Sequence, residues 1–88
     1  MVSIIKIVVK DFKSFMDGIK ASQPLRDKYA VTIVNIYRAR DNQNQLFIIS
    51  EYRDEVSASE YFNSAELASA MKQSGIIGEP EGWTVDKA

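Results

Sequence analysis

Any chemistry in this chain has to come from carboxylates, tyrosines, lysines, arginines or a bound organic cofactor, because its 88 residues include no histidine and no cysteine. Without those two residue types the chain lacks the usual general base at neutral pH, the thiolate nucleophile and the commonest protein ligands of zinc and haem. We therefore predict that neither folding nor any activity requires a metal or a haem, and we expect that any reaction uses no cofactor.

Glu51 and Lys6 are the charged residues that interrupt apolar runs of the sequence. A carboxylate partly buried in a cleft can act as a base, although a structural ion pair or a strand end in water explains Glu51 equally well. We expect the first and third strands to be parallel neighbours, so that Lys6 could lie near Glu51. A desolvated lysine could act as a base or form a Schiff base, and a paired or snorkelling lysine is the alternative.

Arg38 is a further candidate, and the strand pattern places it on the same face of the expected sheet as Glu51. If residues 41–44 form a four-residue loop, Arg38 lies opposite Phe47 and roughly 13 Å from Glu51 along the strands. Direct contact is not expected, but a ligand carrying a carboxylate or an enol could bridge the two groups. We predict a substrate-binding set without an assigned catalytic residue: Arg38, Glu51, Tyr37, Tyr52 and Trp83.

The elements that would position these groups begin with a strand and a helix. Residues 2–9 are rich in isoleucine and valine, which favours a strand, and Asp11 is suited to cap a helix. Apolar residues from Phe12 onward recur at the spacing of one helix face. Pro24 opposes a smooth continuation, so a second short helical turn is expected from about Ser22.

Two strands, a helical region and a last strand follow. The β-type runs 31–40 and 46–53 flank a segment, 41–44, that has the composition of a hairpin connection. A helix then begins after Asp54 or, through a capping box, after Ser57, and Ser64 starts a further helical segment. Gly75 is suited to end it. A connector at 76–80 leads to a short strand at 82–85.

This order predicts an α+β protein with the ferredoxin-like βαββαβ fold, in which a four-stranded antiparallel sheet carries helices on one face, and residues 1–88 form a single domain. The strands are apolar on both faces: in the first, Ile5 and Ile7 alternate with Ile4 and Val8. Helices cover only one face, so we expect a homodimer that joins the other faces and buries Ile33 or Ile36. A solvent-facing sheet is the alternative.

The charge balance gives no reason to expect nucleic acid or membrane as a partner, because 11 basic and 12 acidic side chains leave a net charge of −1. The N-terminal apolar run is too short for a membrane span and lacks the pattern of a signal peptide. We therefore expect a cytoplasmic protein.

Several motifs are spread over nearly the whole chain and are most specific in its last third. They are Val9-Lys10-Asp11-Phe12, Pro24-Leu25-Arg26, Val34-Asn35-Ile36-Tyr37-Arg38, Glu51-Tyr52, Phe62-Asn63-Ser64-Ala65-Glu66-Leu67, Met71-Lys72 and Gly75-Ile76-Ile77-Gly78-Glu79-Pro80. Together they resemble the small dimeric α/β-barrel proteins of the antibiotic biosynthesis monooxygenase-like superfamily, and in particular an uncharacterised, cyclase-like branch.

The resemblance implies a ferredoxin-like monomer whose sheet pairs face to face in a homodimer. The superfamily includes cofactor-free oxygenases of aromatic polyketides, isomerases, stress proteins and haem-degrading enzymes, which use a proximal histidine that this chain lacks. We therefore expect a cleft between sheet and helices that binds a small apolar or aromatic molecule, with cofactor-free monooxygenase- or isomerase-type chemistry. A non-catalytic dimeric module with a structural, stress or assembly role is the alternative.

Overall fold

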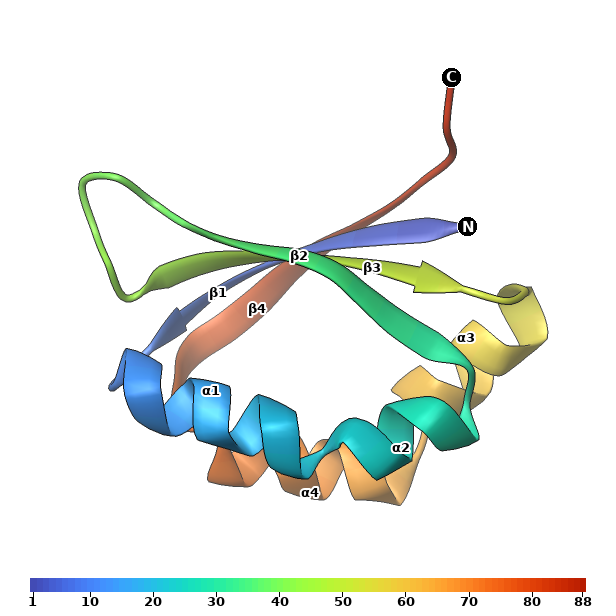
Figure 1. The fold of residues 1–88 in the computed structure, drawn as a ribbon, viewed down its shortest axis with the longest axis horizontal. Coiled ribbons are helices and arrows are strands. Elements are labelled where there is room, and N and C mark those ends of the chain that lie inside the picture. The colour runs from blue at the N-terminus through green and yellow to red at the C-terminus, as the bar shows by residue number, and fades with distance from the viewer.

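Residues 1–88 are all described by the computed structural model, in which one four-stranded sheet carries every helix on the same side (Figure 1). The elements are β1 (Val2–Val9), α1 (Phe12–Ala21), α2 (Gln23–Lys28), β2 (Val31–Arg38), β3 (Gln45–Tyr52), α3 (Glu55–Phe62), α4 (Ala65–Gln73) and β4 (Ile76–Val85). The strand order is β2-β3-β1-β4, and all neighbouring strands are antiparallel. This confirms the predicted ferredoxin-like fold.

Polar side chains begin three of the helices. The backbone N–H of Ser14 donates to the Asp11 carboxylate over 2.8 Å, and that of Ser57 donates to Asp54 over 2.7 Å. Ser64 accepts from the N–H of Leu67 over 3.1 Å. Of the two alternatives for the helix after the third strand, the cap at Asp54 is therefore the observed one.

We expect the two aspartate caps to make stability depend on pH in the acid range. Hydrogen bonds from Ser14 lower the pKa of Asp11, and the backbone N–H of Ser57 lowers that of Asp54. Their stabilisation is complete above the pKa of an unfolded aspartate, about 3.9, and is lost as the pH falls through the lower folded value.

The check is the melting temperature as a function of pH for the wild type and for Asp11→Asn/Asp54→Asn. Asparagine is also a good N-cap but does not titrate. The double variant should therefore lose less melting temperature than the wild type between about pH 5 and pH 3. Equal losses in the two proteins would contradict the assignment.

The core lies between the sheet and the helices. Ile7, Val9, Phe15 and Leu46 form one buried cluster, which packs β1 and β3 against α1. A second cluster of Val31, Tyr52 and Ala58 packs the other end of the sheet against α3. No side chain of α4 is fully buried, so α4 contributes least to this core.

Each end of β3 lies one residue earlier than predicted, and larger differences occur at the end of β2 and the start of β4. β2 ends at Arg38 instead of at residue 40, and the connection to β3 is correspondingly longer. β4 begins at Ile76, because the segment expected to be a connector pairs with the end of β1. This pairing is irregular between Lys6 and Val8 of β1, where β4 bulges around Gly78, whose φ is +72°. Beyond the bulge, β4 pairs with β1 again and continues to Val85.

A similar irregularity in β2 decides which side chains face the helices. The register between β2 and β3 shifts between Ile33, which pairs with Ser50, and Asn35, which pairs with Ile49. Val34 is the extra residue, so Ile33 and Ile36 both lie on the helix-covered face. The prediction that one of these two isoleucines faces a partner chain is therefore wrong.

The opposite face of the sheet, here called the outer face, carries no helix (Figure 1). Its partly buried apolar side chains include Val2, Ile4, Val8, Phe47 and Ile49, and its exposed ones include Val34, Tyr37, Ile77 and Trp83. None of the helices has the length and hydrophobicity that crossing a lipid bilayer requires.

Candidate functional site

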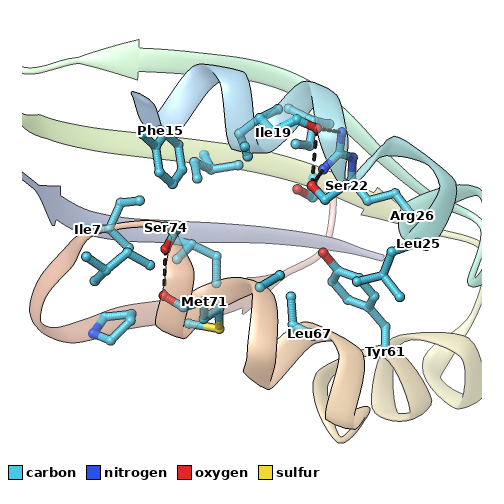
Figure 2. Close-up of a pocket in the computed structure, with 18 of the residues that line it drawn as sticks. Ile7, Phe15, Ile19, Ser22, Leu25, Arg26, Tyr61, Leu67, Met71 and Ser74 are labelled. Carbon is cyan, nitrogen blue, oxygen red and sulfur yellow. Dashed lines mark hydrogen bonds between the residues drawn. The ribbon is translucent and has the colours of Figure 1, made fainter. Parts of the chain in front are cut away.

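A cleft of about 980 Å³ lies between the helix-covered face of the sheet and the helices (Figure 2). The helices α1 and α2 form one wall, α4 forms the other, and the strands form the floor. Of the 28 residues that line it, 16 are hydrophobic. The volume is in the range of sites for small organic molecules, about 300–1,000 Å³.

One end of the cleft is apolar. Phe15 and Ile19 of α1 face Met71 of α4 across it, and Ile7 of β1 lies on the floor (Figure 2). Phe15 is fully buried behind this surface, whereas Leu67 and Met71 are only partly covered. The α4 wall is therefore the side on which apolar side chains remain free to contact a ligand.

The other end of the cleft contains a buried cation, Arg26. The residue is only 4% exposed, and its guanidinium donates to the hydroxyl of Ser22 over 2.7 Å, to the carbonyl oxygen of Ile19 and to the amide oxygen of Gln23 over 3.0 Å. None of the ion pairs in the chain includes Arg26. The charge is therefore held by neutral acceptors alone.

Two tyrosines line the same end. Burial raises the pKa of Tyr61 and of Tyr52 above the ordinary value of the phenol, and the charge of Arg26 partly offsets this for Tyr61. Both phenols therefore stay protonated at neutral pH and can donate a hydrogen bond. Their rings are 6.4 Å apart and belong to a cluster with Tyr29 and Phe62.

Tyr52 is also fixed from the floor of the cleft. Its hydroxyl shares a 2.7 Å hydrogen bond with that of Ser3, and both residues are buried. We expect Tyr52→Phe to destabilise the protein by about 1–2 kcal/mol, because it leaves the Ser3 hydroxyl buried without this partner.

A double-mutant cycle with Ser3→Ala, followed by urea unfolding, tests this expectation. The double variant should lose less than the sum of the two single losses, because removing both partners leaves no unpaired hydroxyl. Strictly additive losses would show that the bond contributes nothing.

Of the five residues predicted to bind substrate, Tyr52 alone lines this cleft. Arg38 lies on the helix-covered face, where its guanidinium stacks 3.8 Å from the ring centroid of Phe12 and donates to the backbone oxygen of Gln43 over 3.0 Å. Arg38 therefore holds the β2–β3 loop against α1, beside the apolar cluster.

Glu51, Tyr37 and Trp83 lie on the outer face. The prediction that Arg38 and Glu51 share a face is wrong, because Arg38 pairs with Leu46 and the shift at Val34 places Glu51 on the opposite side. The structure therefore does not gather the five residues around one cavity.

The expected approach of Lys6 to Glu51 is also wrong. The strands β1 and β3 are antiparallel, so Lys6 lies opposite Phe47 whereas Glu51 lies opposite Val2. The Lys6 ammonium is instead 4.0 Å from the carboxylate of Glu81 on β4. Both side chains of this pair are accessible on the outer face.

The sequence pattern did not predict that Arg26 is buried and lines the cleft. An arginine after a proline in a six-residue helix has the pattern of a surface residue, and its burial arises only from the packing of α2 against the end of α1.

No group of three or more acidic side chains that could hold a metal ion occurs in the structure.

Comparisons with known proteins find similarity in fold. No protein-family model matches the sequence, and no curated protein matches it. A proposed antibiotic biosynthesis monooxygenase from Bordetella bronchiseptica superposes with a TM-score of 0.81 and 15% identity, over 99% of this chain and 95% of that one. A second such protein, from Caulobacter crescentus, superposes with a TM-score of 0.79 and 9% identity, over 99% of this chain and 88% of that one.

SnoaB, a cofactor-independent oxygenase from Streptomyces nogalater, superposes with a TM-score of 0.75 and 11% identity, over 99% of this chain and 93% of that one. The resemblance in the sequence motifs is thus confirmed as a likeness of fold over nearly the full length of the chain. Because the identities are low, this similarity in fold does not show which reaction or substrate, if any, belongs to this chain.

Proposed function

We propose that this chain, which has the fold of the antibiotic biosynthesis monooxygenases, binds a small apolar or aromatic molecule in the cleft for cofactor-free monooxygenase- or isomerase-type chemistry. The observation that supports this most directly is the cleft itself, with about 980 Å³ of space and mainly hydrophobic walls. A pocket of this size and polarity, with a few polar groups at one end, is typical of a small-molecule site.

The groups in the cleft limit the chemistry that the protein itself can supply. Tyr52 and Tyr61 are protonated phenols, so they act as hydrogen-bond donors or acids and not as bases. A monooxygenation then takes its electrons from the substrate: an activated CH₂ group and O₂ give a ketone and water. An isomerisation instead moves one proton within the substrate. Both reactions need an oriented substrate and a dry apolar wall.

We also propose that two copies of the chain join their outer faces in a homodimer. This face leaves aromatic side chains in water: Tyr37 is 56% exposed and Trp83 is 50% exposed. A two-fold partner would cover both with its own copy of the same surface. The charges on the face are few, and Lys6 and Glu81 already lie near each other.

A thermal-shift screen of aromatic and polyketide-like compounds tests binding. A ligand should raise the melting temperature with the logarithm of its excess over Kd. Ala70→Phe, which places a ring on the α4 wall, should abolish the shift, whereas Ala68→Phe on the exposed side of the same helix should preserve it. The absence of any hit, or equal hits in Ala70→Phe, would contradict the proposal and favour a non-catalytic dimeric module.

A further inference from the structure

We infer that Arg26 binds a planar oxyanion, a carboxylate or an enolate, that the aromatic ligand of the cleft carries. This inference rests on the proposed function, because it names the ligand class of the same cleft. The position of Arg26 is visible in Figure 2, where its guanidinium lies at one end of the cleft beside Ser22 and opposite the hydroxyl of Tyr61.

The first argument is the charge of Arg26. Burying an ionised side chain is unfavourable unless an opposite charge or enough hydrogen bonds compensate it. Arg26 is almost fully buried, yet its three acceptors are a hydroxyl, a backbone carbonyl and an amide. The adjacent acid, Asp27, accepts instead from the amide of Gln23 over 2.8 Å. A counter-ion for Arg26 is thus missing from the chain.

The second argument is the number of free donors. A guanidinium has five N–H groups. In Arg26, Nη2 makes two hydrogen bonds and Nη1 makes one, so the Nε N–H and one Nη1 N–H have no acceptor in the protein. Every fully buried side-chain nitrogen and oxygen has a partner. The Nε atom is therefore accessible, and Arg26 lines the cleft.

The third argument is the distribution of the other charges. Only two more charged residues line the cleft, Glu66 and Glu81, and the carboxylate of Glu81 points to the outer face. Glu66 forms a 2.9 Å ion pair with Lys28, and Glu81 lies 4.0 Å from Lys6. Arg26 is therefore the one cleft charge without an opposite partner.

The ligand that fits these features has an oxyanion at one end and an aromatic body. The phenol of Tyr61 would donate a second hydrogen bond to the oxyanion, beside the guanidinium. The aromatic body would extend from there toward Ile19 and Met71 (Figure 2). Arg26 also ties α2 to the end of α1 through Ile19 and Ser22, and these contacts leave the Nε donor free.

The test uses two probes of the same shape, 2-naphthoate and 2-naphthamide, with calorimetric titration at pH 7. The acid is ionised and the amide is neutral, so the ratio of their dissociation constants reports the anion site. We expect the wild type to bind naphthoate about tenfold or more tightly than naphthamide. Arg26→Met should bring the ratio close to one while the affinity for naphthamide stays unchanged.

Two further variants separate charge recognition from folding. Lys20→Met removes a cation from the exposed side of α1 and should leave the ratio as in the wild type. Arg26→Lys retains the charge without the guanidinium geometry and should give an intermediate ratio, which also serves if Arg26→Met does not fold.

The binding results distinguish a failure of the anion site at Arg26 from a failure of the proposed cleft function. If both probes bind the wild type with a ratio near one, or if Arg26→Met keeps the wild-type ratio, the anion site is wrong and the proposed cleft function stands. If Arg26→Met weakens both probes equally, the residue is structural, which also overturns the inference. If neither probe binds the wild type and the wider screen gives no hit, the proposed function itself fails.

Discussion

Replacing Phe47 by lysine should convert the protein from a dimer into a monomer. Phe47 lies near the middle of the outer face, on β3, opposite Lys6 of β1. In a face-to-face dimer a lysine here would be buried beside another cation without a counter-ion, a change that costs several kcal/mol. The fully buried core on the other side of the strand is left untouched.

Light scattering after size exclusion measures this change. The wild type should give twice the chain mass of 9.9 kDa, and Phe47→Lys should give the chain mass itself. Val56→Lys is the matched control, because Val56 is an exposed apolar residue on α3, with 67% of its surface in water. That variant should remain a dimer.

If Phe47→Lys does not fold, the mass and the melting temperature of the wild type still test whether the protein is a dimer. The melting temperature of a dimer rises with protein concentration, because dissociation accompanies unfolding. A wild-type mass of one chain, or a melting temperature that does not change with concentration, would contradict the dimer.

Replacing the neighbouring Leu46 by alanine should have the largest effect on stability. Leu46 points to the opposite side of β3, is 0% exposed and packs with Ile7, Val9 and Phe15. A leucine-to-alanine change at such a site costs about 2–5 kcal/mol, since it removes buried apolar surface and leaves a cavity. This is a large share of the stability of a small domain, about 5–15 kcal/mol.

The matched control is Leu67→Ala on α4. Leu67 is only partly covered and faces the open cleft, so its removal creates no closed cavity. Urea unfolding should therefore show a clearly smaller loss than for Leu46→Ala. Equal losses would mean that the α4 wall is packed like the core and that the cleft is not open to a ligand.

The local elements were predictable because short-range chemistry determines them. Asp11, Asp54 and Ser64 accept hydrogen bonds from backbone groups three residues later, and this spacing can be recognised in the sequence. The two-sided apolar pattern of the strands likewise predicted the uncovered outer face. The order of the strands follows from the order of the elements along the chain.

The candidate site was less predictable because it depends on small irregularities and on distant packing. One extra residue at Val34 reverses the faces of the second half of β2, and no residue type in the sequence marks it. Arg38 and Glu51 were thus expected on one face and lie on two. Arg26 acquires its burial only when α2 packs against the last turn of α1.

The most direct test of the cleft as the functional site is an NMR titration with two reporters. Met71 lines the cleft, and Trp83, the only tryptophan, lies on the outer face. Adding 2-naphthoate to protein labelled at the methionine methyl groups and at the indole nitrogen should shift the Met71 methyl signal and leave the Trp83 indole signal in place. A shift of the indole signal without one of the Met71 methyl would locate binding on the outer face and contradict the account.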